Sequence, residues 1–170
     1  MLDFLFRRLT ASAPRGAALF DAVTAIAREP HWYVEGKVPD TIDGRFAVLS
    51  TIIALVLVRL EAEAEQGDVV SVGLTERFIE VMESEHRELG LGDPTLGKTV
   101  RKLVGSLARR TDRWRSATTG AADWTDIARE SLYKGNASAD AVQHGSASLR
   151  RLWTRLEGAA LGEIDAGKIR

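Results

Sequence analysis

The chain has 170 residues, of which 45% are hydrophobic and 28% are charged, and its formal net charge is −1. A chain of this length buries about two-thirds of its surface on folding, so it can form a substantial core. The absence of cysteine excludes disulfides, thiolate nucleophiles and cysteine-ligated metals, and it suits a reducing cytoplasm. The near-zero net charge argues neither for nor against a nucleic-acid partner.

The sequence contains no segment typical of membrane targeting or membrane spanning. The apolar residues of Met1–Phe6 precede the basic pair Arg7 and Arg8, whereas a signal peptide has its basic residues first and a longer apolar stretch. The longest apolar run, Phe46–Val58, is shorter than the ~20 residues that a membrane span needs. We therefore expect a cytoplasmic protein without a transmembrane segment, in which this run is a buried helix.

Apolar residues recur at alternating spacings of three and four along most of the chain, which predicts helices throughout. In chain order, the expected helices contain Leu19, Val23, Ile26 and Ala27; Ile42, Phe46, Leu49, Ile53, Val56 and Leu60; Leu74, Phe78, Val81, Met82 and Leu89; Val100, Leu103, Val104, Leu107 and Trp114; Ile127, Ala128 and Leu132; and Leu149, Leu152, Trp153, Leu156, Ala160 and Ile164. The second of these is apolar on nearly all sides, as helices at the centre of a bundle are. We predict an all-α fold, a single-domain bundle of about six to seven helices around a buried central helix at about 41–66.

Capping residues indicate where the helices begin and end. Asp40 is the expected N-cap of the central helix and Gly67 its end, while Gly90 would close the next helix. Asp93 would cap the third helix, with Pro94 at its first position. Asn136 is expected to open the last helix, at about 136–166, and the expected surface loops are Glu65–Gly73, Thr118–Asp123 and Lys134–Ala137.

Charge is unevenly distributed between two neighbouring helices. The segment Glu76–Asp93 carries a net charge of −4, and the segment Lys98–Arg115 carries +6. One interpretation is a solvated helix face that partly pairs with the acidic helix beside it. The other is a docking surface for an acidic partner, such as ribosomal RNA, an anionic lipid surface or an acidic protein. The residues of that candidate patch are Lys98, Arg101, Lys102 and Arg109.

The segment Gly92–Thr99 satisfies the pattern G-x-x-x-x-G-K-[ST] of a nucleotide-binding P-loop. A P-loop follows a β-strand, whereas the preceding segment, Glu76–Leu89, is predicted to be an acidic amphipathic helix. Asp93 would cap a helix that begins before Gly97 and Lys98, so the loop needed to hold phosphate is absent, and its carboxylate would repel phosphate. P-loop-like nucleotide binding therefore stands only as an alternative function.

The remaining candidates for chemistry are isolated. Glu83 and His86 form one Glu-x-x-His, but a di-iron site needs two such pairs on separate helices and further carboxylates. His31 and His144 stand in no such motif, and the sequence contains no nucleophile elbow. We predict no catalytic residue, no metal site, no cofactor and no DNA binding, and we expect the protein not to be an enzyme.

Two blocks of sequence resemble the ubiquinol–cytochrome c chaperone family. The first is His31–Tyr33 followed by Val38–Phe46, and the second is Met82 followed by Arg87–Asp93 and the Gly97-Lys98 pair that opens the basic helix. The resemblance covers about residues 30–133, with 1–29 and the C-terminal helix flanking it. It also accounts for the P-loop pattern, because the glycine-lysine pair belongs to the helix of that family.

The resemblance implies a function without chemistry of its own. Members of the family bind newly made cytochrome b, the membrane subunit of respiratory complex III, and hold it until haem and partner subunits join. Mitochondrial members work with a small partner protein and contact the ribosome. A chain of this length is expected to act at the cytoplasmic face of the inner membrane. A generic helical adaptor with another client is the remaining alternative.

A helical bundle can offer a groove or face to an apolar or amphipathic client segment. Polar and aromatic residues gather where the expected buried helix begins, and we predict that this group lines the client surface: Trp32, Tyr33, Asp40, Asp43, Arg45 and Phe46. The alternative interpretation is structural: Asp40 and Asp43 cap the helix, Gly44 allows close packing and Phe46 belongs to the core.

Overall fold

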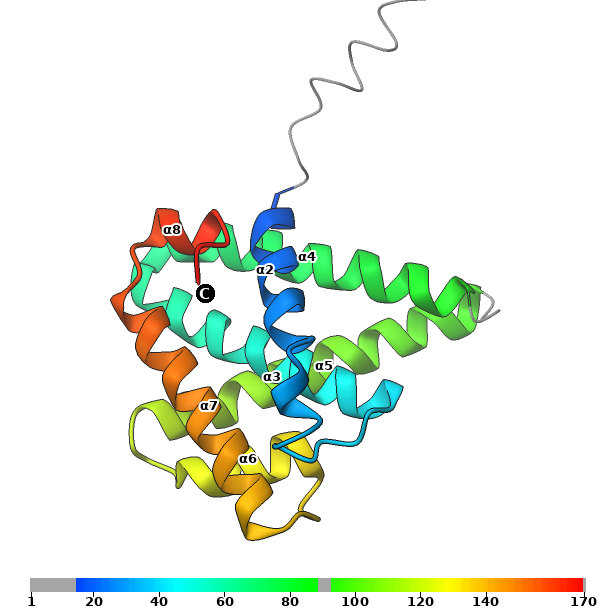
Figure 1. Cartoon of the computed structure of the whole chain (residues 1–170). Coiled ribbons are helices and arrows are strands. Elements are labelled where there is room, and N and C mark those ends of the chain that lie inside the picture. The colour runs from blue at the N-terminus through cyan, green and yellow to red at the C-terminus, as the bar shows by residue number, and fades with distance from the viewer. Residues whose placement is uncertain (1–14, 89–92, 170) are drawn as a thin grey trace, which may run out of the picture.

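The computed structural model describes residues 15–88 and 93–169, apart from the side chains of 85–87 and 93–96. The elements, in chain order, are α2 (Ala17–Ala27), η1 (Pro30–Trp32), α3 (Ile42–Leu60), η2 (Glu61–Glu63), α4 (Ala64–Glu88), α5 (Asp93–Thr118), α6 (Trp124–Tyr133), α7 (Ala139–Gly158) and α8 (Leu161–Asp165) (Figure 1). No strand occurs among the described residues, so the predicted all-α fold is confirmed. Gly90 and the N-terminal apolar residues lie outside the described ranges.

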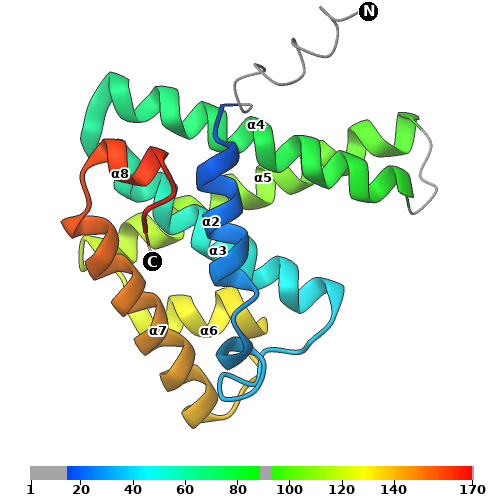
Figure 2. The same cartoon turned by 45° about the horizontal axis from the view of Figure 1, so that its top comes forward.

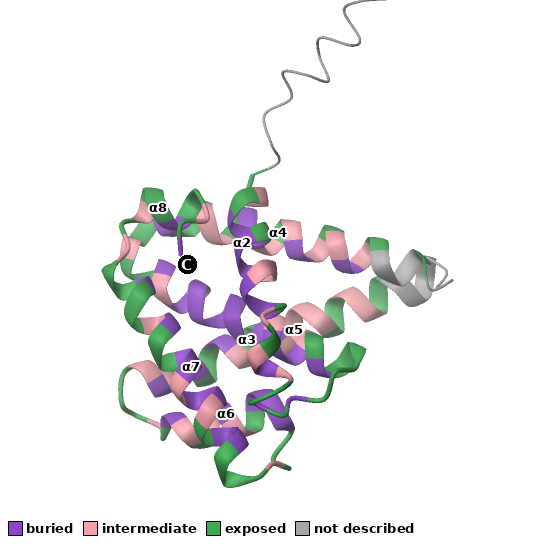
Figure 3. Cartoon of the chain, in the orientation of Figure 1, coloured by how far each residue is buried: buried purple, intermediate pink, exposed green. Residues whose placement is uncertain are grey.

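Helix α3 forms the centre of the bundle. Twelve of its nineteen residues are buried, and it contacts α2, α4, α5, α6 and α7. Buried apolar side chains from α2 through α8 join those of α3 in one cluster, which Figure 3 shows as purple segments concentrated along α3. The prediction of a buried central helix is confirmed, because a helix that is apolar on all sides is stable in water only when other helices surround it.

Helix α3 begins differently from the prediction. Thr41, not Asp40, is the N-cap, and its hydroxyl accepts a hydrogen bond from the backbone N–H of Gly44 at 3.2 Å. Asp40 instead accepts a hydrogen bond from Arg45 at 2.6 Å. A Cβ at Gly44 would lie 1.9 Å from the carbonyl oxygen of Pro39, so the chain entering this helix passes too close for any other residue. Gly44 thus admits the backbone of Pro39, which leads into the same helix, and not a second helix as was expected.

The end of α3 also differs from the prediction. The helix stops at Leu60, and the chain turns through η2 and a positive φ of 48° at Ala64 before α4 begins. Gly67 does not end the central helix but lies inside α4, where a Cβ would meet the carbonyl oxygen of Leu60 at 2.0 Å. The predicted loop Glu65–Gly73 is therefore wrong: it forms the first turns of α4, which start against the end of α3.

The C-terminal region contains two helices where one was predicted. Ser138, not Asn136, caps α7, and its hydroxyl accepts from the N–H of Ala141 at 3.4 Å. The backbone is extended at Ala159 and Ala160, which separates α7 from α8. The connections between α5 and α6 and between α6 and α7 fall where loops were predicted.

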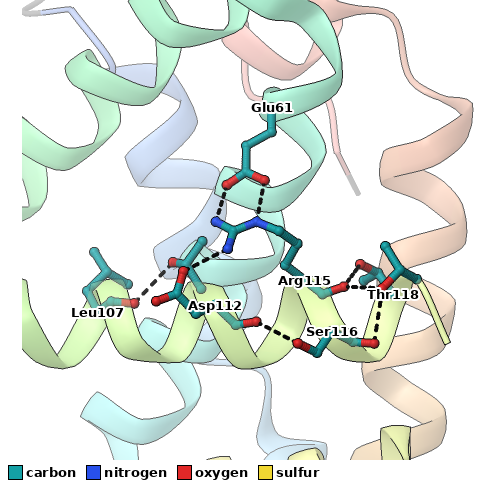
Figure 4. A network of polar contacts seen from close by, with 8 residues as sticks. Glu61, Leu107, Asp112, Arg115, Ser116 and Thr118 are labelled. Atoms are coloured by element: carbon teal, nitrogen blue, oxygen red, sulfur yellow. Dashed lines mark hydrogen bonds and ion pairs between the residues drawn. The ribbon is translucent and has the colours of Figure 1, made fainter. Parts of the chain in front are cut away.

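Two arginines join the C-terminal end of α3 to other helices. Arg59 donates to the carbonyl oxygens of Leu156 and Ala159 on α7, at 2.8 and 3.0 Å. Arg115 of α5 donates to both carboxylate oxygens of Glu61, at 2.7 and 2.6 Å, and also to Asp112 (Figure 4). Bidentate pairs of this kind fix geometry as well as charge. The side chains around η2 therefore hold α5 and α7 in register with α3.

Arg110 is a partly buried cation between three helices. Its Nη1 donates to Thr51 Oγ1 of α3 at 2.8 Å and to the carbonyl oxygen of Ser131 of α6 at 2.7 Å. In the described part of the chain it has no carboxylate partner, and burial lowers its pKa to about 10. It remains protonated at neutral pH, and its two hydrogen bonds join α3, α5 and α6.

A histidine pair joins η1 to α7. His31 Nε2 lies 3.1 Å from Glu29 Oε2, and His31 Nδ1 lies 3.0 Å from His144 Nε2. A carboxylate only accepts hydrogen bonds, so the proton of neutral His31 sits on Nε2 and His144 Nε2 donates to His31 Nδ1. Burial lowers the pKa of His31 below its usual 6.5. If both rings were protonated, two N–H groups would face each other.

Replacement of Arg110 by alanine is expected to lower the free energy of unfolding by about 1–3 kcal/mol, because Thr51 and the Ser131 carbonyl lose their shared donor. The matched control is Arg109→Ala, since Arg109 is exposed on the same helix and its loss should change stability by less than about 0.5 kcal/mol. Urea denaturation measures both. Equal stability of the two variants would show that the Arg110 contacts contribute nothing net.

The histidine pair predicts a pH dependence of stability. Because the folded state lowers the pKa of His31, the unfolded chain binds a proton more readily, and the free energy of unfolding should fall as pH drops below about 6.5. In His31→Gln this part of the pH slope should disappear. An NMR titration of His31 in the folded protein should give a midpoint below 6.5, and a midpoint at or above that value would contradict the assignment.

Candidate functional site

The six residues predicted to line a client surface separate into exposed and buried groups. Asp40, Asp43 and Arg45 are exposed, and Tyr33 is half-buried. Trp32, in contrast, is 1% exposed, and its Nε1 donates to the carbonyl oxygen of Ile26 at 2.8 Å. The prediction that Trp32 lines the surface is therefore wrong, because the indole fills the core beneath η1.

Phe46 also has a structural role. Its ring packs partly buried against the core, with the ring of Phe78 on α4 at a centroid distance of 6.2 Å. This matches the alternative interpretation given for Phe46, in which the residue belongs to the core. The two bulkiest apolar members of the predicted group thus support the surface from below and do not form it.

The polar members form two ion pairs on the outside. Arg45 donates to Asp40, and this contact holds the pKa of the Asp40 carboxyl below its usual value. Asp43 pairs with Lys134 at the end of α6, at 3.1 Å. Tyr33 donates its hydroxyl proton to the carbonyl oxygen of Ala27 at 2.7 Å, and burial raises its pKa. Exposed pairs of this kind contribute little stability, so they are free to exchange partners.

Two exposed apolar residues lie in the same segment, and sequence reasoning missed both. Ile42 is 78% exposed and Val34 is 57% exposed. Helical periodicity placed Ile42 in the buried stripe, but it is the first residue of α3, where the bundle does not yet surround the helix. We name the η1–α3 surface after its residues Tyr33, Val34, Asp40, Ile42, Asp43 and Arg45.

The backbone next to this surface is held in place from the other side. The Tyr133 hydroxyl lies 2.6 Å from the carbonyl oxygen of Gly36 and 2.8 Å from that of Ala141, so one phenolic proton serves two acceptors. Burial raises the pKa of Tyr133 to about 12. This contact ties the segment between η1 and α3 to the junction of α6 and α7, so the surface is ordered before any partner arrives.

The basic residues of α5 divide into two sets. Toward the C-terminus the arginines are engaged, since Arg110 donates to Thr51, Arg113 pairs with Glu130 and Arg115 pairs with Glu61. Toward the N-terminus the predicted patch of Lys98, Arg101, Lys102 and Arg109 is exposed, and within the described ranges none of the four has an ion-pair partner. This half of α5 lies beside α4 in an arm that extends from the rest of the molecule (Figure 2).

The P-loop pattern does not form a P-loop in this structure. Residues 93–99 are the first turns of α5, and helix α4 precedes them where a P-loop has a strand. Lys98 is exposed on the helix. The arrangement provides no ring of backbone N–H groups around a phosphate at residues 93–99, and Gly92 lies outside the described residues.

Other chemistry is also without a structural basis in the described part of the chain. No group of three or more histidine, aspartate or glutamate side chains there could hold a metal ion. The side chain of His86, the second half of the Glu-x-x-His, lies outside the described residues. In the ranges that the structure covers, no helix combines the length and apolar character needed to cross a membrane.

Comparison with known proteins gives one family and one solved structure. The family model of the ubiquinol–cytochrome C chaperone matches residues 34–169. The crystal structure of the Cbp3 homolog from Brucella abortus superposes with a TM-score of 0.76 at 24% identity, covering 98% of this chain and 94% of that one. The comparison with curated proteins found no match.

The family match extends beyond the blocks of sequence that carry the resemblance. The resemblance was expected to end near Tyr133, whereas the matched region begins at Val34, after the His31–Tyr33 block, and continues through α7 and α8. The C-terminal helices are thus part of the matched family region and not an addition to it. Since the match spans well over half of the sequence, the chain belongs to the ubiquinol–cytochrome C chaperone family.

Proposed function

We propose that this protein is an assembly chaperone of respiratory complex III that binds newly made cytochrome b through the η1–α3 surface. Membership of the chaperone family supports the general role. The observation that carries the specific proposal is Ile42, an aliphatic side chain 78% exposed at the start of the most buried helix. An isoleucine in that position on a rigid element is an anchor for an apolar partner segment.

The charged residues around this anchor fit a binding surface. Asp40, Asp43 and Arg45 are exposed and form only surface pairs, so they can exchange those partners for groups on a client. An apolar centre with a polar rim is the usual anatomy of a protein interface. A membrane protein that has not yet joined its partner subunits exposes apolar helix surface, which such an anchor would cover.

Holding a client in this way requires no reaction. The surface is ordered in advance, because Tyr133 fixes the neighbouring loop and Thr41 caps the helix that carries Ile42. Pre-ordering reduces the conformational entropy lost on binding. The surface contributes an apolar anchor and exchangeable charges, which suits transient capture and release.

A second part of the proposal concerns location. Four cations of α5 that have no ion-pair partner among the described residues support peripheral association of the protein with an anionic surface, either the cytoplasmic face of the inner membrane or ribosomal RNA. Each basic residue near an anionic membrane contributes about 1 kcal/mol of attraction. The patch would place the α4–α5 arm toward that surface and leave the η1–α3 surface for the client.

Substitution of Ile42 by aspartate is expected to abolish recovery of cytochrome b with the tagged protein, because a charge replaces the apolar anchor. The fold should survive, since Ile42 is largely exposed. Val69→Asp is the matched control, because Val69 is 56% exposed on α4 and does not belong to the η1–α3 surface. This substitution should leave the recovery of cytochrome b unchanged. Asp43→Ala with Arg45→Ala should reduce recovery less. Undiminished capture by folded Ile42→Asp would refute the η1–α3 surface.

Charge reversal of Lys98, Arg101 and Lys102 to glutamate is expected to release the protein from vesicles containing phosphatidylglycerol, measured by co-sedimentation. Wild-type binding should weaken with added salt and be absent on neutral phosphatidylcholine vesicles. A parallel assay with ribosomal RNA distinguishes the two anionic surfaces. If neither vesicle nor RNA binding changes in the folded variant, the patch is only a solvated helix face.

A further inference from the structure

A cavity of about 670 Å³ opens between the end of α2, η1 and helix α7. Its size falls in the range typical of ligand pockets, roughly 300–1,000 Å³. The apolar side chains that line it are Ile26, Trp32 and Leu152, and the polar ones are Glu29, His31, Ser148, Arg150, Arg151, Thr154 and Arg155. About two turns of α7 thus bring three arginines to one cleft above an apolar floor, which we call the α7 cleft.

The arginines of the α7 cleft outnumber its carboxylate. Glu29 is the one acid that lines the cavity, and it already accepts a hydrogen bond from His31. Burial keeps His31 neutral at neutral pH by lowering its pKa. The lining is therefore cationic, although the chain as a whole has a net charge of −1.

None of these arginines has a carboxylate within ion-pair distance among the residues that the structure describes. Arg150 lies over the ring of Trp124, with its Cζ 4.7 Å from the centroid, and Arg151 donates to Ser148 on its own helix at 2.8 Å. Arg155 has no partner within those residues. Two guanidinium groups are thus positioned by neutral contacts that leave their charge uncompensated.

Nearby arginines behave differently. Arg59, close to the C-terminal end of α7, pairs with Glu63, and Arg115 pairs with Glu61 and Asp112. At these two arginines the fold supplies carboxylates, whereas Arg110 joins helices through Thr51 and the Ser131 carbonyl oxygen. In the α7 cleft the fold supplies none beyond Glu29, and it places the arginines around a concave surface with an apolar floor.

We propose that the α7 cleft binds an acidic segment of a partner polypeptide. Guanidinium groups bind carboxylates through paired, charge-assisted hydrogen bonds. Arg151 and Arg155 are four residues apart, so they lie one turn apart on the same side of α7 and can contact two carboxylates of one segment. Ile26, Trp32 and Leu152 beneath the arginines are at most 2% exposed, so recognition depends on the guanidinium groups and not on the apolar floor.

The shape of the cleft favours a peptide over a membrane. A lipid bilayer contacts a flat or convex face, whereas these arginines surround a hollow that a bilayer plane cannot enter. The α7 cleft also differs from the η1–α3 surface, because the cleft opens toward α7 and the other surface lies at the start of α3. The inference does not rest on cytochrome b as the client, so either proposal can fail alone.

The test is fluorescence anisotropy with a labelled synthetic peptide in which glutamate alternates with leucine, added to the full chain. Arg151→Glu with Arg155→Glu should weaken binding by about tenfold or more, because two charge-assisted contacts become repulsive. The matched control, Lys37→Glu with Lys168→Glu, changes the net charge by the same amount at exposed positions outside the cleft and should leave binding within about twofold. The same peptide with glutamine for glutamate should bind far more weakly.

Equal weakening in both charge-reversal variants would overturn the proposal, since attraction would then depend on overall charge. Equal binding of the glutamine peptide would overturn it as well. Vesicles of phosphatidylglycerol bound through Arg151 and Arg155, with no peptide binding, would assign the cleft to lipid instead. If the charge-reversal variant did not fold, Arg151→Gln with Arg155→Gln would serve, and a folded variant with unchanged peptide affinity would refute the cleft.

Discussion

The burial of α3 on all sides is the constraint on which the other elements depend. A helix without a solvated face cannot leave polar groups to water, so its polar side chains find partners inside the protein. Ser50 donates to the carbonyl oxygen of Phe46, and Thr51 donates to that of Ala47 and accepts from Arg110. The last contact brings a cation into the core and fixes the distances between α3, α5 and α6. The hydrogen bonds of the polar side chains on α3 thus position the neighbouring helices as much as apolar packing does.

The two ends of the same helix leave the core and take on different roles. At its C-terminal end, Arg59 and the adjoining Glu61 connect α7 and α5 to the centre. At its N-terminal end, none of the described helices covers Ile42, and the close approach of Pro39 to Gly44 fixes the direction from which the chain arrives. A rigid element that emerges from the core is a suitable support for a binding surface, because its position is set by the whole bundle.

Periodicity in the sequence was sufficient to predict the all-α fold and the central helix, because apolar spacing reports which faces are buried. Helix boundaries were less predictable. A glycine typical of a helix end, Gly67, lies inside α4 because Leu60 approaches it from a neighbouring element. Trp32 was expected at the surface and is buried, whereas Ile42 was expected in the core and is exposed. Both outcomes depend on tertiary contacts between distant residues, which local spacing does not report. The pairing of His31 with His144, 113 residues apart, could not be seen from spacing alone.

The sequence shows that basic residues cluster along α5, but only the structure shows which of them are already engaged and which are available to a partner. Along α5, Arg109 is exposed, Arg110 is partly buried and Arg115 is held by two carboxylates, although all three count equally toward the positive charge of the segment. Only the uncompensated cations produce an attraction that a partner can use. They are found on the α4–α5 arm and around the α7 cleft, where Arg150, Arg151 and Arg155 lie within six residues of one another. An anionic surface and an acidic peptide would therefore bind to different helices, and neither would need to displace a client from the start of α3.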